Sequence, residues 1–584
     1  MLKDDPIYRV LYVDLTRRRC LVETRQELFE ESLGGTGVGI RLLEEECPAG
    51  ADPLGPENPI ILTVGPLVGL FPLASKTVAM FKSPHNAGLG ESHAGGRSAV
   101  AIRMAGYGAI VIRGASTLPV YLVIDEDRVK FRDASALWGL SSSYTAGSVL
   151  RKRERGSGLR SIMRIGRAGE RLVSYACVIT ETYRHFGRLG LGAVFGSKQL
   201  KAVVVSGRRD LPVTDRRAYR KTYDAIFRAA TESDLMKKYH QLGTSMNVIP
   251  LDAAGGLPTR NLQAGRFEGA EAISGERLAR DYLGRRVSCA HCPVACIHLA
   301  ALRIPYPQDP YFYKTLMLGY DHEPIYATGS MLGLADVHGM LQLMDEIEVH
   351  GLDVMSTGVA LAWATEAMQH GLISGQETDG ITLSFGDADG YIEAARRIVC
   401  QPTEFYRVLA RGVDYASSMY GGQDFALAFG GNEMPGYHTG PACHIGCLTG
   451  ARHSHLDSAG YSVDQKRPRK GEPLDPTLVA EALISEERWR QVLTSLVICL
   501  FARGVYDRES VLKALAIAGC EWTEAELDRL GVQTLRRKYD FKQREGFDLA
   551  SMRIPRRILE TPSPAGPFDE TFLRRAIARY QELL

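Results

Sequence analysis

The spacing of apolar residues changes character partway along the chain. Up to about residue 210, short apolar runs alternate with Gly and Pro, as in YRVLYVDL, PIILTVG, KTVAMF, GAIVIRG, PVYLVIDEDRVKF and KAVVVSG. Runs of this length that are rich in β-branched and aromatic residues and end at breakers predict strands. The sequence therefore predicts a β-rich domain over residues 1–210.

From Asp215 onward, apolar residues recur at a spacing of three and four. The pattern is clear in RRAYRKTYDAIFRAATESDLMKKY, LGLADVHGMLQLMDEIE, TGVALAWATEAMQHG and FYRVLARGVDYASSMYG, and it predicts amphipathic helices. A glycine-rich stretch near residue 425 indicates a second boundary, after which PTLVAEALISEERWRQVLTSLVICLF is again helical in pattern. We therefore expect an α+β protein, in which two mainly helical domains, 211–425 and 426–584, follow the β-rich domain.

Composition narrows the classes of function. The 584 residues include 70 basic and 68 acidic side chains, for a net charge of +2, which argues against a nucleic-acid partner. The opening MLKDDPIYRVLYVDL lacks the pattern of a secretion signal, and no apolar run reaches the roughly 18 residues of a membrane span. Eleven cysteines, an odd number, suit a reducing compartment better than a disulfide framework. We expect a cytoplasmic protein that does not bind membranes.

Three cysteines, Cys289, Cys292 and Cys296, follow the spacing C-x-x-C-x-x-x-C. Three clustered thiols suit a soft metal or an iron-sulfur cluster and require a fourth ligand. Zinc sites usually combine two close cysteine pairs, although His291 within the loop could contribute. A bacterial ferredoxin loop would instead read C-x-x-C-x-x-C with a further C-P. An iron-sulfur cluster with one remote thiolate fits best, and zinc or unligated thiols remain as alternatives.

The segment GYHTGPACHIGCLTGARHSHLDSAGYSVD is unusually dense in titratable residues, namely Tyr437, His438, Cys443, His444, Cys447, His453 and His455. Imidazole titrates near neutrality, so these histidines could hydrogen-bond a substrate or move a proton. Histidines that merely cap a loop are one alternative. A zinc site on Cys443, His444 and Cys447 is another, although no fourth ligand stands at zinc spacing.

Motifs along nearly the whole chain resemble the aldehyde ferredoxin oxidoreductase family, whose members carry tungsten or molybdenum on two pterins. These motifs include ESLGGTGVGIRLLEEECP, SHAGGRSAVAIRMAGYGAIVIRGAS, FGRLGLGAVFGSKQLKAV, the cysteine triplet, HGLDVMSTG and SLVICLF. The resemblance implies that the β-rich domain carries both pterins and that the helical domains close over them. It also implies a 4Fe-4S cluster on Cys289, Cys292, Cys296 and Cys499, with Cys499 on an apolar helix.

The resemblance further implies which residues bind the pterins. Glycine lets backbone N–H groups approach an anion closely, and the segments that match those holding the pterin phosphates and a bridging magnesium contain His93, Gly95, Gly96, Arg184, His185, Phe186, Gly187 and Gly190. The acidic segment that binds a pterin amino-pyrimidine edge is matched by Glu348, Leu352 and Asp353, because a carboxylate accepts two adjacent donors. Taken singly, these residues are also typical of sheet turns and of a solvated helix end.

The chain departs from the family pattern at three places. Lys76 stands where an arginine often bridges pterin and cluster, so a point charge replaces a planar fork. Thr494 replaces an acidic residue five positions before the remote cysteine. In QDPYFYKT, a glutamate expected near the metal is absent, and Tyr311 and Tyr313 stand in its neighbourhood. We take Tyr313 as a catalytic candidate.

The activity implied by the resemblance is oxidation of an aldehyde to a carboxylate at a bis-pterin tungsten or molybdenum centre. His455 is the first candidate to assist at the substrate oxygen and His453 the second, since RHSHLD resembles an H-x-H element of one branch of the family. Electrons would leave through the cluster to ferredoxin or an iron-sulfur partner subunit, and a homodimer is compatible with this scheme. One alternative is reduction of an aromatic acyl thioester or a carboxylic acid with the same cofactors. A zinc-stabilised scaffold without enzymatic activity is an alternative of another class.

Overall fold

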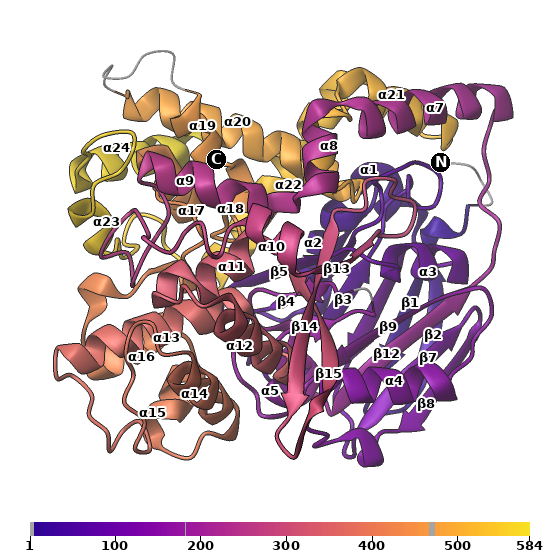
Figure 1. The fold of residues 1–584 in the computed structure, drawn as a ribbon. Coiled ribbons are helices and arrows are strands. Elements are labelled where there is room, and N and C mark those ends of the chain that lie inside the picture. The colour runs from indigo at the N-terminus through magenta and orange to yellow at the C-terminus, as the bar shows by residue number, and fades with distance from the viewer. Residues whose placement is uncertain (1–4, 182, 467–473) are drawn as a thin grey trace.

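The computed structural model describes residues 5–181, 183–466 and 474–584, and its fold is α+β. Figure 1 shows the strands of two six-stranded mixed sheets gathered on one side, with most later helices above and beside them. The first sheet, in the order β2-β1-β6-β3-β4-β5, contains β1 (Arg9–Asp14), β2 (Arg19–Thr24), β3 (Ile60–Thr63), β4 (Thr77–Lys82), β5 (Leu89–Ala94) and β6 (Ala109–Arg113). The second, in the order β11-β10-β9-β12-β7-β8, contains β7 (Val120–Asp125), β8 (Arg128–Asp133), β9 (Leu159–Ile165), β10 (Val178–Ile179), β11 (His185–Phe186) and β12 (Leu200–Gly207).

Every apolar run from which we predicted strands contains at least one strand of these two sheets, so this part of the prediction is confirmed. Strands β3, β4 and β12 are buried along their whole length, because helices cover them. Helix α2 (Gly35–Glu46) packs on β3 and β4, and α3 (Ser98–Ala105) packs on β9 and β12. A strand covered on both faces is expected to be apolar throughout rather than alternating.

The predicted helices of the second half are also confirmed. They are α7 (Arg216–Glu232), α8 (Asp234–Gln241), α12 (Val337–His350), α13 (Val354–Gln369), α15 (Glu404–Leu409), α16 (Val413–Tyr420) and α20 (Pro476–Ser495). Helix α13 is buried almost all round, including Trp363 at its centre, as expected for a helix that lacks a polar face. Among the described residues, no helix is long and apolar enough to cross a membrane. The domain limits at residues 210 and 425 remain predictions.

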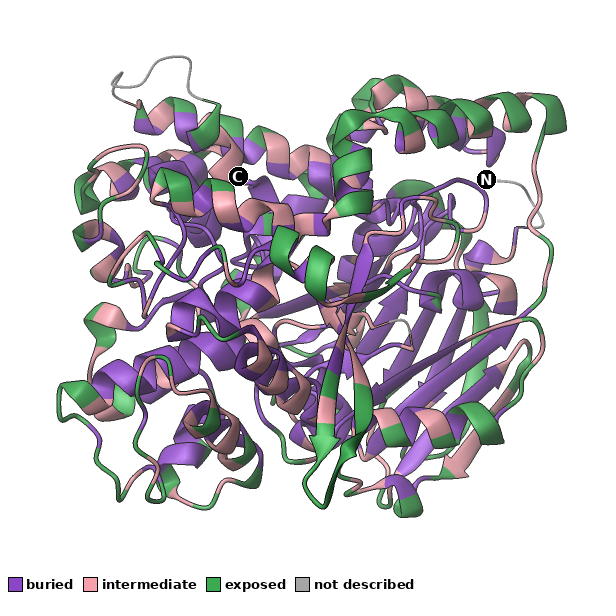
Figure 2. Cartoon of the chain, in the orientation of Figure 1, coloured by how far each residue is buried: buried purple, intermediate pink, exposed green. Residues whose placement is uncertain are grey.

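One sheet lies inside the segment that we expected to be helical. It consists of β13 (Leu283–Val287), β14 (Ile297–Tyr306) and β15 (Asp309–Tyr320), and the cysteine triplet occupies the connection between β13 and β14. Figure 2 shows that the hairpin end of β14 and β15 is largely exposed. Short apolar runs such as IHLAAL do not distinguish strand from helix by periodicity, which explains why this sheet was missed.

The expected helical position of Cys499 is wrong. Helix α20 ends at Ser495, and Val497 has a φ of 52°, which is incompatible with a continued helix. Cys499 therefore lies in an extended connection before the short helix η6 (Leu500–Gly504). The chain leaves the helix where it meets the β-rich part.

A glycine allows the end of α20 to approach the first sheet closely. A Cβ added to Gly65, which follows β3, would lie 2.8 Å from the carbonyl carbon of Leu496. Real Cβ atoms do not approach backbone so closely, so Gly65 keeps the end of α20 against the first sheet.

We predict that Gly65→Ala displaces the chain at Leu496 and destabilises the protein by about 1–3 kcal/mol, as overpacking usually does. The cluster content of purified protein should fall as well, because Cys499 follows three residues later. Thermal unfolding and iron analysis measure both effects. The matched control is Gly375→Ala, whose added Cβ meets nothing within 4 Å. Equal melting temperatures for the two variants would contradict the prediction.

Candidate active site

Backbone hydrogen bonds bring the cysteine triplet and Cys499 to one place. The Leu73 N–H donates to the carbonyl of His291 in the cysteine loop, at 3.0 Å. On the other side, the Cys499 N–H donates to the Leu73 carbonyl at 2.9 Å, and the Lys76 N–H donates to Val497 at 3.2 Å. The segment Leu73–Lys76 thus holds the triplet and the remote cysteine on either side of it.

The four thiols influence one another electrostatically. Burial, with the neighbouring thiols of Cys499 and Cys289, raises the pKa of Cys296 to about 11, although the Arg184 guanidinium opposes this rise. Burial also raises the pKa of Cys292, and the other three thiols add to that rise. Thiols gathered at one place are suited to a bound metal cluster, which takes them as thiolates.

A cavity of about 350 Å³ lies beside the thiols. Its lining contains nine of the twelve residues predicted to bind the cofactor, namely Lys76, His93, Gly95, Arg184, His185, Gly187, Glu348, Leu352 and Asp353. Cys499 and His455 also line it. One cavity therefore connects the predicted cluster ligand, the predicted pterin site and the first catalytic candidate.

Three predicted cofactor-binding residues lie outside the cavity lining. The Phe186 ring is fully buried in the apolar core of the sheets. Gly190 has a φ of 84° and begins α6 (Leu191–Ser197), where an added Cβ would collide with the Ser174 carbonyl. Gly96 accepts a hydrogen bond from Ala290 of the cysteine loop at 2.8 Å. These residues shape the fold around the site, and their predicted contact with a cofactor is not reproduced.

The predicted acidic residues are buried and paired, so the alternative of a solvated helix end is wrong. Glu348 lies 2.8 Å from His185 Nε2. Asp353 lies 3.3 Å from Arg188 Nε and accepts the Ser356 N–H at 2.8 Å. Buried carboxylates are stable only with such partners. The two acids therefore form a fixed polar wall of the cavity.

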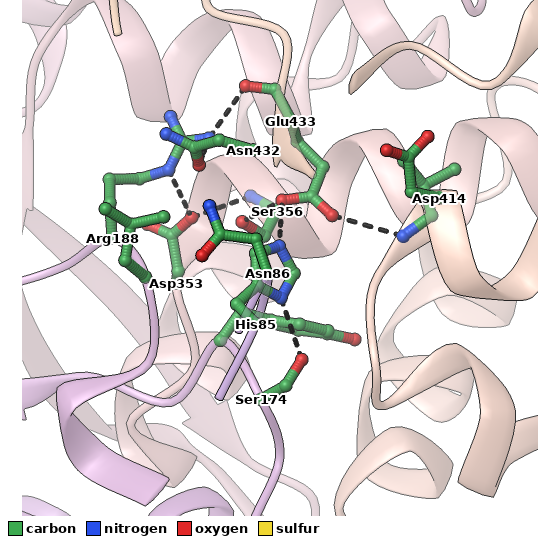
Figure 3. Close-up of polar contacts among 12 residues, drawn as sticks. His85, Asn86, Ser174, Arg188, Asp353, Ser356, Asp414, Asn432 and Glu433 are labelled. Carbon is green, nitrogen blue, oxygen red and sulfur yellow. Dashed lines mark hydrogen bonds and ion pairs between the residues drawn. The ribbon is translucent and has the colours of Figure 1, made fainter. Parts of the chain in front are cut away.

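A network behind this wall was missed by sequence reasoning (Figure 3). Glu433 lies 2.9 Å from His85 Nε2 and accepts from Ser356 Oγ at 2.7 Å. Arg188 donates to the Glu433 carbonyl at 2.7 Å and also contacts Asn432. Burial raises the pKa of Glu433, but the charges of His85 and Arg188 bring it down to about 2. Arg188 lies within the motif FGRLGLGAVFGSKQLKAV, between Gly187 and Gly190, which the resemblance matched to a pterin-phosphate segment, so it could have been recognised as a candidate.

His455 lines the cavity together with a glutamate. Its Nε2 lies 3.3 Å from Glu323 Oε1, and its Nδ1 has no hydrogen-bond partner among the described residues. Burial raises the pKa of Glu323 to about 8 and lowers the pKa of His455 well below its usual value. Near neutral pH the pair therefore consists of a protonated carboxyl group beside a neutral imidazole, which can donate and accept protons within the cavity.

Glu323 corrects one sequence-based expectation. A glutamate is present in the cavity, but it belongs to DHEP at the start of α11 (His322–Thr328) rather than to QDPYFYKT. The letters QDPYFYKT form the exposed end of the β14–β15 hairpin. Tyr313 is 50% exposed there, packs its ring against Arg303 and does not line the cavity, so this geometry does not support its predicted catalytic role.

The second catalytic candidate, His453, also lies outside the cavity lining. It is buried, with Nδ1 3.1 Å from the Cys447 carbonyl and Nε2 2.9 Å from Lys542 Nζ. This position does not support its predicted role at the substrate. In the same segment, His438 Nδ1 lies 2.9 Å from His444 Nε2. Within the described ranges no three His, Cys, Asp or Glu side chains converge on a single metal-ion position, so a zinc site in this segment is not supported.

The departure at Lys76 has a partial counterpart. Arg184 lines the cavity and lies within the electrostatic reach of Cys289, Cys296 and Cys499. A guanidinium is therefore present between cavity and thiols, although not at the expected position. Thr494 lies outside the cavity lining and donates its hydroxyl to the Arg490 carbonyl at 2.8 Å.

Fold and site together define an oxidoreductase enzyme, and comparison with known proteins identifies its family. Residues 10–207 match the family model "Aldehyde ferredoxin oxidoreductase, N-terminal domain", and residues 221–584 match "Aldehyde ferredoxin oxidoreductase, domains 2 & 3". The chain belongs to the aldehyde ferredoxin oxidoreductase family.

Relatives of differing activity resemble the chain. The tungsten-containing aldehyde ferredoxin oxidoreductase of Thermococcus kodakarensis is 32% identical over 96% of this chain and 92% of the relative. The aliphatic sulfonate oxidoreductase, WOR-like subunit, of Pyrococcus furiosus is 30% identical over 69% of this chain and 66% of its own length. Among solved structures, the active-site complex BamBC of benzoyl coenzyme A reductase has a TM-score of 0.84 at 20% identity, and it covers 99% of this chain and 94% of that one. This last likeness supports the fold alone.

We predict that Cys499→Ala removes the visible absorption and electron paramagnetic resonance signal of the cluster, because no other described thiol shares the electrostatic environment of the triplet. Cys447→Ala, which removes a buried thiol from α17 (Pro441–Thr449), is the control and should keep both signals. An unchanged spectrum in Cys499→Ala would exclude Cys499 as a ligand.

The pKa of Glu323 predicts a pH-dependent cost to stability. Between its ordinary pKa of 4.5 and about 8, the unfolded chain loses this proton while the folded chain keeps it, so the free energy of unfolding falls as pH rises. Glu323→Gln removes this term. In cofactor-free protein, unfolding by urea should show Glu323→Gln gaining a few kcal/mol relative to wild type between pH 5.5 and 8.5. A difference independent of pH would contradict the raised pKa.

Proposed function

We propose that the protein oxidises an aldehyde to a carboxylate at a tungsten or molybdenum centre held by two pterins in this cavity. Electrons would pass through a 4Fe-4S cluster on Cys289, Cys292, Cys296 and Cys499 to ferredoxin or an iron-sulfur partner subunit. The observation that carries the proposal is the cavity whose lining includes both Cys499 and the His455–Glu323 pair. The relatives that match 96% of the chain and bear the name of an aldehyde oxidoreductase support it.

The residues present fit such a cofactor. A Cβ on Gly95 would lie 2.7 Å from Cys289 Sγ, so this glycine leaves the approach between cavity and thiols open. Arg184 Nε and His322 Nδ1 are buried donors or acceptors with no hydrogen-bond partner in the described part of the chain, as expected of groups that await a polar ligand. Glu348 and Asp353 would bind the amino groups of a pterin. Lys76 and Arg184 would lie beside its anionic groups, and the segment of His93 would hold the phosphates with a magnesium ion.

The bound metal centre would accept the two electrons of the oxidation. Addition of water to an aldehyde and its conversion to a carboxylate release protons, so the cavity needs groups that hold and transfer them. The neutral His455 can accept a proton at the substrate oxygen or hydrogen-bond that oxygen as its charge changes. Glu323, 3.3 Å away, holds the imidazole and can exchange a proton with it near neutral pH. The Tyr437 ring packs against His455 in a tilted arrangement, at a centroid separation of 5.3 Å, and limits the motion of the imidazole.

We predict that His455→Gln lowers kcat for aldehyde oxidation about 10²- to 10⁴-fold, the usual range for loss of a general acid-base group. Metal content and the cluster spectrum should stay unchanged. Tyr313→Phe provides the matched control because Tyr313 lies on the exposed hairpin, and its kcat should equal that of wild type. Steady-state assays with a viologen acceptor measure both. Retention of wild-type kcat in His455→Gln would contradict the role of His455 as the acid-base group.

The names of the relatives state different substrates. Both the substrate and the direction of the reaction therefore need a test. Reduction of an aromatic acyl thioester or a carboxylic acid with the same cofactors remains the second candidate, because Lys76 and Thr494 depart from the family pattern. Product analysis after incubation with aldehydes and, separately, with reduced viologen and acyl thioesters distinguishes the two. Turnover only of the thioester would replace the aldehyde proposal.

A further inference from the structure

A second hollow, of about 210 Å³, lies outside the active site and is strongly basic. Four arginines line it, with Glu181 as the acidic member. Arg97 comes from the start of α3, Arg151 from the end of α4 (Ser143–Arg153), Arg155 from the loop that follows and Arg160 from β9. In Figure 1, α3, β9 and α4 lie to the right of the β13–β15 sheet. We call this hollow the arginine cleft.

The positive charge of the arginine cleft is only partly offset within the described chain, by Glu181. None of its four arginines has a described carboxylate oxygen within 4.0 Å of its guanidinium nitrogens. Glu181 is occupied differently, since it accepts the Ile162 N–H at 2.8 Å and the Ser161 hydroxyl at 3.0 Å. Burial lowers the pKa of Arg160, and the charges of Arg151 and Arg97 lower it further, while the Glu181 carboxylate raises it in part. The arginines therefore lie close enough to repel one another.

The arginine cleft adjoins the cysteine loop. Arg97 directly follows Gly96, whose carbonyl accepts the Ala290 N–H at 2.8 Å, and Ala290 is the neighbour of Cys289. On β13, the exposed Arg285 and Arg286 precede Cys289 by a few residues and add to the positive charge. The thiol loop itself is only partly buried, since Cys289 and Cys292 have intermediate exposure.

We propose that the arginine cleft is the docking surface of a small acidic iron-sulfur protein that exchanges electrons with the cluster. This inference rests on the proposed function, because it assumes a redox cluster on the four thiols. In each transfer, one electron leaves the reduced cluster and reduces the oxidised cluster of the partner, and no bond forms or breaks. The partly exposed cysteine loop is the side from which a partner can approach the cluster.

Exposure favours a protein over a small anion as the occupant. Arg97, Arg151 and Arg155 are exposed and extend their charges into solvent, whereas a small-anion site would enclose them. Complementary charges speed the encounter of two proteins and fix their relative orientation, and arginine is enriched at protein interfaces. An acidic partner would meet four positive charges beside the partly exposed cysteine loop.

The test is a calorimetric titration of the anaerobically purified holoprotein with an acidic ferredoxin. Charge reversal in the double variant Arg97→Glu/Arg155→Glu should raise Kd at least about 10-fold at low ionic strength, and wild-type binding should weaken with salt more steeply than that of the variant. Arg575→Glu, on exposed α24 (Glu570–Leu583), is the matched control and should bind like wild type. Cluster absorption confirms that each variant is intact. If the charge reversal harms folding, Arg97→Gln/Arg155→Gln should give a smaller rise of the same sign.

A kinetic arm separates this inference from the proposed function. In the double variant, electron transfer to ferredoxin should show a raised KM, while aldehyde oxidation with a viologen keeps its rate. Absence of aldehyde oxidation with either acceptor in wild type would refute the proposed function, and the titration would still report on docking. Equal Kd values for the double variant and Arg575→Glu would overturn the docking surface. A second result would also overturn it. If wild type binds inorganic phosphate tightly, and the double variant loses phosphate binding but keeps ferredoxin binding, the cleft is a small-anion site.

Discussion

The backbone hydrogen bonds of Leu73–Lys76 are the constraint on which the site depends. They hold the cysteine loop through His291 and the remote Cys499 directly, so four thiols from distant parts of the chain meet without help from their own side chains. Main-chain groups make these bonds, so they do not depend on the identity of the side chains. The cluster site and the cavity beside it are thus consequences of how α20 ends against the first sheet.

Electrostatic pairing then decides what each buried carboxyl group can do. Glu433 faces His85 and Arg188 and is held ionised, whereas Glu323 has the neutral His455 beside it and a pKa raised to about 8. Burial raises the pKa of both carboxyl groups. Only Glu433 has enough positive charge nearby to lower its pKa below the ordinary value. The first residue therefore organises the wall, and the second is available for proton transfer. Two carboxyl groups with opposite pKa shifts are a frequent sign of such a division of roles.

Much of this site could be predicted from sequence. The predictions that failed did so for one physical reason. Local apolar patterns predicted the strands and helices, and motif matches predicted nine cavity-lining residues. Which side chain faces the cavity depends on long-range packing that no local pattern contains. His453 and His455 are two residues apart, yet only His455 lines the cavity, because His453 has a φ of 55° before α18 (His455–Ser458) begins. Glu323 was missed for the same reason, because the sequence does not show where β15 ends and which side chain after it faces the cavity.

Elemental analysis of anaerobically purified protein tests the central claim most directly. The account predicts about four iron atoms per chain, as a single cubane cluster requires, together with tungsten or molybdenum near one equivalent. Zinc without iron, tungsten or molybdenum would contradict it, and would leave a zinc-stabilised scaffold as the interpretation of the four cysteines.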